Sequence, residues 1–259
     1  AAKRMKETIS TFKLAALPNA LRRDGEAFKS AAKVRVMHAM VRTNLLRKPK
    51  HWDYDVYGVP IPQVDQMGAA LNFNFRSSVW ALKRKGKNRG KYTKEVRNVV
   101  EHHRYLAYLL GMHDQFLSDD PKQITDTWNM CQATLKHKYD ERGRQLNDAT
   151  LNAYRRHGHG LYDKLYHYLD VRSSKFLYKM VVGGKTAKDM GVEPNVGDMM
   201  SFLALATPIT AKLGVMLALR TFPAGRKWVS EYTTKEVRKQ LDMEGTAEYK
   251  TEEANYKFG

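Results

Sequence analysis

The segment from residue 26 to residue 47 contains neither glycine nor proline and carries apolar residues at helical spacing. Asp24 can cap a helix N-terminus, and Pro49 restricts the residue before it, so both ends of a helix are marked. No useful length of the chain alternates apolar with polar residues, and glycine and proline are sparse, at 17 and 8 of 259 residues. The sequence therefore predicts an all-α fold with a long helix over 26–47.

Similar patterns predict the rest of the organisation. The chain reads as a helical domain over 1–222 followed by a strongly charged extension over 223–259. Further helices are expected over 3–17, 63–82 and 92–111, from Pro121 onward, and in pieces within 147–180, with loops at 51–62 and 183–197.

One apolar segment, Met199 to Leu219, is long enough to cross a bilayer. Pro208 and Lys212 lie inside it, and a lysine in the middle of a membrane span costs free energy. The pattern favours two buried or interfacial helical pieces bent at Pro208 over a membrane span.

The net charge is +18, from 45 lysines and arginines against 27 acidic residues. A charge this positive requires an anionic binding partner. An anionic membrane surface, acidic protein partners and an anionic cofactor all satisfy this requirement. The one dense basic run, Lys83 to Lys91, has no apolar partner and favours a solvated loop over a phosphate-binding patch. No nucleic-acid-binding motif is present, which disfavours nucleic acid as a partner. The single cysteine, Cys131, excludes an intramolecular disulfide and a thiolate metal cluster.

Arg35, His38 and Arg42 are three and four residues apart, so their side chains lie on one helix face. A neutral imidazole is a good axial ligand of haem iron, and flanking guanidiniums suit haem carboxylates. Spacing alone is more typical of a lone surface or core histidine on a basic helix.

The surrounding residues carry a resemblance. Lys33 to Arg42, which reads KVRVMHAMVR, resembles the signature helix of the latex clearing proteins (rubber oxygenases) and of the ER-bound oxygenase of mycophenolic acid synthesis. Arg4 and Thr8 precede His38 by 34 and 30 residues, where that family has an arginine and a threonine. Gly58 to Asp65 is similar to the family's G-x-P-I-N-Q-x-D loop, with a proline in place of the asparagine. The resemblance covers roughly residues 3–130.

The resemblance implies a globin-like, all-α core that binds haem b and cleaves carbon–carbon double bonds of isoprenoid or other hydrophobic substrates with dioxygen. It implies that His38 ligates the haem iron and that Arg35 and Arg42 support the helix and the haem carboxylates. Arg4 and Thr8 are the implied catalytic residues near the haem. The family's N-terminal helices, which precede the Arg4 position, have no counterpart in this sequence.

A second interpretation is a non-catalytic accessory subunit of a large mitochondrial membrane complex, such as a divergent ATP synthase or respiratory complex. It explains the high positive charge, the charged C-terminal tail and a start at Ala-Ala-Lys that fits removal of a transit peptide. On this interpretation the protein is mitochondrial, membrane-associated and bound to other subunits. A third interpretation is a basic protein associated with nucleic acid.

Overall fold

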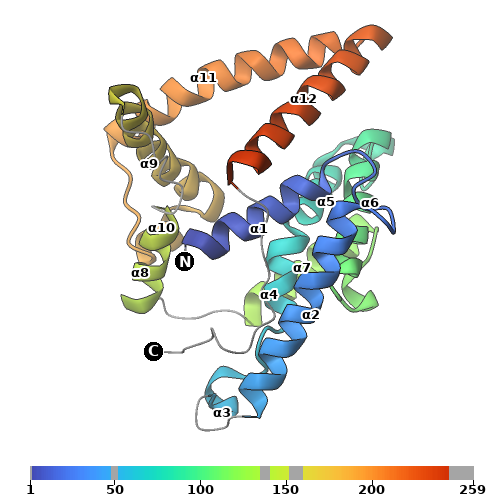
Figure 1. Ribbon diagram of the computed structural model, residues 1–259, viewed down its shortest axis with the longest axis vertical. Helices are drawn as coiled ribbons and strands as arrows, with labels where there is room; N and C mark the ends of the chain where they lie inside the picture. The colour runs from blue at the N-terminus through green and yellow to red at the C-terminus, as the bar shows by residue number, and fades with distance from the viewer. Residues whose placement is uncertain (1, 48–51, 135–140, 152–159, 245–259) are drawn as a thin grey trace. The chain divides into compact units, whose positions relative to one another are not determined.

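The computed structural model describes residues 2–47, 52–134, 141–151 and 160–244. Within these ranges all regular structure is helical, which confirms the predicted all-α class (Figure 1). The helices are α1 (Ala2–Ala15), α2 (Glu26–Leu46), α3 (Tyr54–Tyr57), α4 (Gln63–Ala70), α5 (Asn72–Lys83), α6 (Lys94–Leu109), α7 (Pro121–Thr134), α8 (Glu141–Leu151), α9 (Leu161–Val182), α10 (Gly184–Asp189), α11 (Val196–Leu219) and α12 (Pro223–Glu244).

The chain forms two compact units, which are described separately. Unit 1 comprises Ala1–Lys13 and His137–Thr246, and unit 2 comprises Leu14–Lys136 and Ala247–Gly259. These units are defined by which residues pack together. The predicted division into a domain over 1–222 and an extension over 223–259 is not tested by them and stays a prediction. The charged segment after that residue contains α12, which packs against α11 inside unit 1.

Unit 2 is built around α6. This helix packs against α2, α4 and α5, and α5 packs against α7. Leu106 and Val100 of α6 are fully buried. Two apolar clusters fill the unit: one contains Met67, Ala70, Leu71, Ala107, Met112 and Cys131, and the other contains Ala81, Tyr92, Val100 and Ile124.

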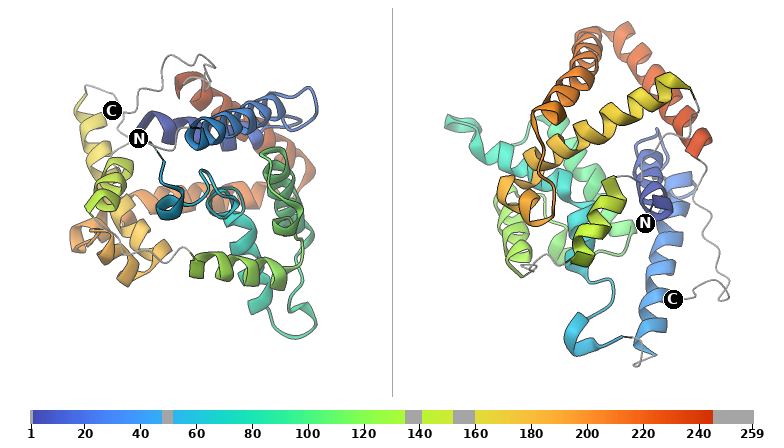
Figure 2. Two further views of the ribbon diagram at one scale, coloured as in Figure 1. Left: turned by 90° about the horizontal axis from the view of Figure 1, so that it is seen from below. Right: turned by 90° about the vertical axis from the view of Figure 1, so that its left-hand side faces the viewer.

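Unit 1 is held together by the packing of α9 against α11, with α8 and α10 also against α9. In both Figure 1 and the right view of Figure 2, α11 and α12 meet at one turn and diverge from it. They therefore form a helical hairpin.

Several predicted boundaries are confirmed. The helix predicted over 26–47 is α2, and the stop predicted at Gly111 is a left-handed residue with φ of 93°. The predicted capping role of Asp24 is wrong, because the N-cap is Gly25 and no side chain caps it. A Cβ on Gly25 would lie 2.2 Å from the Ala20 carbonyl oxygen, so the chain at this position accepts only glycine.

Three other expectations are corrected. The helix predicted over 63–82 is two helices, because the backbone leaves helical geometry at Leu71 (φ −110°, ψ 9°). The loop predicted over 51–62 contains the four-residue helix α3, whose N-terminus is capped by the Asp53 carboxylate. The loop predicted over 183–197 contains α10. These turns are short, and tertiary packing overrides weak local propensity in such segments.

The segment predicted as two pieces bent at Pro208 is one helix, α11, which runs through the proline. Proline removes one backbone donor, the one that would bond the Ala204 carbonyl, and the helix continues despite this loss. The hydroxyls of Thr207 and Thr210 donate to the neighbouring carbonyls of Leu203 and Ala206. A capping box at Asn195 and Asp198 starts the helix. Most of α11 is exposed, so the buried alternative is wrong, and the interfacial alternative stays a prediction.

Candidate functional site

The predicted site lies on the inner face of α2. The first half of this face is buried and consists of Ala27, Ala31 and Val34. At 3.6 residues per turn, the same face continues toward the C-terminus with Arg35, His38 and Arg42. Along this second half, Arg35 is exposed, whereas His38 and Arg42 are partly buried. The site residues therefore extend the core face of the helix into a region that stays accessible.

Arg42 binds the loop that resembles the family's G-x-P-I motif. Its Nε donates to the Pro60 carbonyl oxygen at 3.1 Å, and its Nη2 donates to the Ile61 carbonyl oxygen at 2.9 Å. Ile61 has φ of 53°, a left-handed conformation that is uncommon for a β-branched residue. The two bonds hold this strained turn against α2, so two of the guanidinium nitrogens of Arg42 are committed to the protein backbone.

Gln63, the next polar residue of the motif, connects α4 to the end of α6. Its Nε2 donates to the Gly111 carbonyl oxygen at 3.1 Å, and its Oε1 accepts from the His113 backbone N–H at 2.8 Å. The glutamine therefore satisfies backbone groups of the turn that follows α6. The sequence interpretation assigned no role to this residue, although it is part of the quoted motif.

Arg35 lies against Gly111. A Cβ on this glycine would lie 3.0 Å from the Arg35 Nε and 3.3 Å from its Cγ and Cδ. The positive φ of Gly111 and the adjacent arginine side chain both require glycine here. Arg35, Gly111 and Gln63 therefore form a chain of contacts that joins α2, α4 and α6.

Replacement of Gly111 by alanine is expected to lower the free energy of unfolding by about 1–3 kcal/mol, because alanine is strained at this φ and displaces Arg35. Urea unfolding measures the change. Gly68 of α4 is the matched control, since no atom lies within 4 Å of its Cβ position and its φ is not positive. Gly68→Ala is expected to be neutral or stabilising. Equal destabilisation by both variants would show that the Gly111 geometry does not matter.

His38 is the titratable group at the centre of the face. Its Nδ1 is buried and has no hydrogen-bond partner among the described residues. Burial lowers the pKa of its imidazole, and the positive charge of Arg42 lowers that pKa further. The ring is therefore held neutral at physiological pH, in the form that binds metals.

The unfolding free energy of the protein is expected to fall as pH drops below about 6.5, the ordinary pKa of histidine. Burial lowers the pKa of both His38 and His102, the latter also through His103. In acid the unfolded chain binds protons that the folded chain does not, so stability is full above this pH and is lost below it. Urea midpoints at a neutral and a mildly acidic pH measure the effect, and His38→Gln/His102→Gln should flatten it. An unchanged pH dependence in that double variant would contradict the assignment.

The structure places Arg4 and Thr8 on α1, in unit 1, whereas His38 lies in unit 2. Thr8 is exposed, and the side chain of Arg4 lies outside the described set. Arg35, His38 and Arg42 are brought together along one helix. The catalytic roles of Arg4 and Thr8 stay predictions.

A comparison with protein families gives one match. The model of the family described as ER-bound oxygenase mpaB/B'/rubber oxygenase, catalytic domain, matches residues 1–211. The chain belongs to this family. The match extends beyond the resemblance seen up to residue 130 and reaches into α11, so an oxygenase-type catalytic domain accounts for most of the chain. No curated protein and no solved structure matches the chain significantly.

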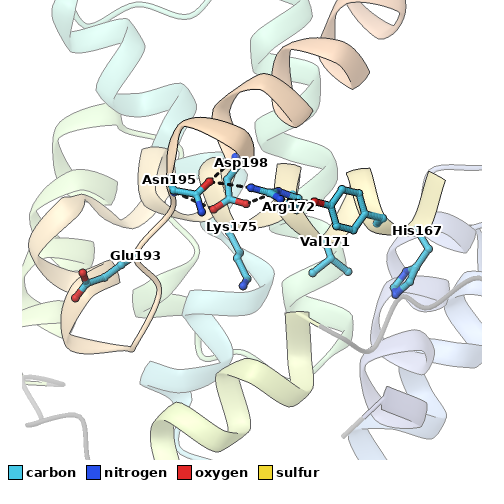
Figure 3. Close-up of a pocket in the computed structure, with 8 residues that line it drawn as sticks. His167, Val171, Arg172, Lys175, Glu193, Asn195 and Asp198 are labelled. Carbon is cyan, nitrogen blue, oxygen red and sulfur yellow. Dashed lines mark hydrogen bonds and ion pairs between the residues drawn. The ribbon is translucent and has the colours of Figure 1, made fainter. Parts of the chain in front are cut away.

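Sequence reasoning missed a pocket of about 450 Å³ in unit 1 of this family member (Figure 3). Arg172 of α9 lies at its centre, with Nη2 donating to Asn195 Oδ1 at 2.8 Å and Nε 2.9 Å from Asp198 Oδ1. A Cβ on Gly197 would lie 2.2 Å from the Arg172 Nη2. The guanidinium thus ties α9 to the N-terminus of α11. The N-x-x-D spacing of Asn195 and Asp198 was the available signal for this capping box.

Proposed function

We propose that the face formed by Arg35, His38 and Arg42 binds haem b, with His38 as the axial ligand of the iron. We further propose that the bound haem serves oxidative cleavage of carbon–carbon double bonds in an isoprenoid or other hydrophobic substrate. The observation that carries the proposal is the His38 imidazole, whose buried Nδ1 has no partner among the described residues in a chain of this oxygenase family.

The residues of the face fit the chemistry of this cofactor. A histidine binds a metal through an unprotonated ring nitrogen, and burial together with the positive charge of Arg42 lowers the pKa of His38 in the required direction. One protein nitrogen is enough to hold haem iron, so a cluster of several ligands is not needed. The Nδ1 atom makes no described hydrogen bond, so no protein partner among the described residues holds the imidazole through this nitrogen.

The two arginines are assigned different roles. Arg42 donates hydrogen bonds from two guanidinium nitrogens to the Pro60 and Ile61 carbonyl oxygens, and we assign it the role of positioning this loop. Arg35 keeps an exposed side chain one turn before His38 and is assigned to a haem carboxylate through a charge-assisted hydrogen bond. This division refines the sequence prediction, which gave both arginines the same part.

When bound, haem supplies the centre at which dioxygen is activated. The contribution of the chain is to hold a neutral imidazole in one orientation and to shape the loop beside it. Arg4 and Thr8 are proposed, from the family resemblance, to bind or orient the reactants.

The test is haem titration of the purified full chain, followed by absorption spectroscopy. A saturable Soret band is expected, and incubation with a polyisoprenoid and dioxygen should release carbonyl products detectable by mass spectrometry. Absence of a Soret band would contradict the proposal. Migration of the protein only within a large complex on a native gel would then support the accessory-subunit interpretation.

A further inference from the structure

The strongest unexplained feature outside the site is the exposed surface of α11. The helix has 24 residues and a mean hydropathy of 1.8 in its most apolar window, yet none of that window is buried. At 1.5 Å per residue it is about 36 Å long. A soluble monomer rarely exposes so long an apolar surface without using it.

The charges of α11 all lie on one side. Asp198 and Lys212 are about four helical turns apart and therefore share a face. Asp198 is buried and pairs with Arg172 of α9. Lys212 donates to the hydroxyl of Tyr232 on α12 at 2.8 Å and lies 4.8 Å from its ring centroid. This inner face of α11 is thus directed toward α9 and α12.

The opposite side, here called the outer face, carries no charged residue along the whole helix. Helical spacing places Leu203, Thr210 and Leu217 near its centre, and all three are exposed. The outer face is completed by Val196, Met199, Met200, Ala206, Thr207, Gly214 and Ala218. A chain of this charge therefore leaves one uncharged apolar strip open to its surroundings.

The turn after α11 carries exposed basic and aromatic side chains, which suit contact with an anionic surface. Arg220, Arg226 and Lys227 are exposed there, together with the aromatic rings of Phe222 and Trp228. Cations beside an apolar helix attract anionic lipids, and aromatic rings favour the boundary between lipid and water. The net charge of +18 has the same sign as this cluster.

We propose that α11 lies in the surface of an anionic bilayer, with the outer face immersed and the inner face toward α9 and α12. A span through the bilayer is disfavoured because Asp198 and Lys212 are held by partners on water-exposed helices. A protein partner would not require both an uncharged strip and a basic, aromatic edge. This inference does not depend on haem binding.

The experiment is vesicle flotation of the full-length protein. Binding is expected to vesicles of phosphatidylcholine and phosphatidylglycerol, and weaker binding to phosphatidylcholine alone or at high salt. Leu203→Gln/Leu217→Gln should weaken binding by about tenfold or more, since two leucines lose their burial in lipid. The matched control is Leu165→Gln/Leu177→Gln on α9, where the exposed fractions of 56% and 48% resemble those of 48% and 63% on α11. That control should bind as the unmodified protein does.

A second measurement reports orientation. The only native cysteine, Cys131, is 5% exposed, so Thr210→Cys on the outer face can be labelled with an environment-sensitive fluorophore. Its emission should shift to the blue on anionic vesicles, whereas a label at Ser230→Cys on α12 should not shift. Failure of the unmodified protein to bind anionic vesicles, or equal loss in both leucine pairs, would overturn the proposal. A blue shift at both labelled positions would overturn the surface orientation.

Discussion

Replacement of His38 by glycine is expected to abolish the Soret band of the haem-reconstituted protein, and added imidazole is expected to restore it. The substitution removes the proposed axial ligand and leaves a space that a free imidazole fits. Because the His38 Nδ1 makes no described hydrogen bond, none is lost through that atom when the side chain is removed. Loss of the ligand should weaken haem binding by more than the roughly 10–100-fold that the loss of an outer-shell partner of a metal ligand costs.

The matched control is His103→Gly, which places the same substitution inside helix α6 of the same unit. The His103 ring is bonded through Nδ1 to the Val99 carbonyl and is not part of the face. This variant should keep the Soret band, since both glycine variants weaken a helix by a similar amount, about 1 kcal/mol. Retention of the band in His38→Gly without imidazole would show that another residue holds the cofactor.

Replacement of Leu106 by alanine is expected to lower the free energy of unfolding by about 3 kcal/mol, within the range of buried leucine-to-alanine changes. Leu106 is 1% exposed and is the largest fully buried side chain among the described residues. It lies on α6, which packs against α2 and α4, the helices that carry the candidate site and its loop. Urea unfolding followed by tryptophan fluorescence measures the change.

Leu46→Ala on α2 is the control, because Leu46 is 47% exposed. It loses little buried surface and should change stability by less than about 1 kcal/mol. Similar losses in the two variants would mean that Leu106 is not part of a tightly packed core. A lower haem affinity in Leu106→Ala would additionally connect the packing of α6 with the candidate site.

The segments that resemble the family show which structural features the local sequence could predict. The helix around His38 and the helix stop at Gly111 were both predictable, because helical spacing and a positive φ at glycine are local properties. The break at Leu71 and the continuation of α11 through Pro208 were not predicted. Leu71 is part of the core of unit 2, and α11 continues through Pro208 although the proline removes one backbone donor, so neither outcome follows from local propensity alone.

The candidate site was likewise predictable only in part. Spacing alone placed Arg35, His38 and Arg42 on one face, and the resemblance gave the two arginines one shared role. The structure separates them, since Arg42 meets the Pro60 and Ile61 carbonyls and Arg35 meets Gly111. These partners come from segments 18 to 76 residues away, so no local pattern could reveal them.

The sequence by itself determined the helical class, the family and the face of α2 that carries His38, because each depends on residue type and short-range spacing. Only the tertiary structure decided that the His38 Nδ1 is buried without a partner, that Arg42 is committed to a loop, and that α11 is exposed. Burial and hydrogen-bond pairing depend on which distant segments meet. That choice is made by the packing of the whole unit and is not written in any single stretch of residues.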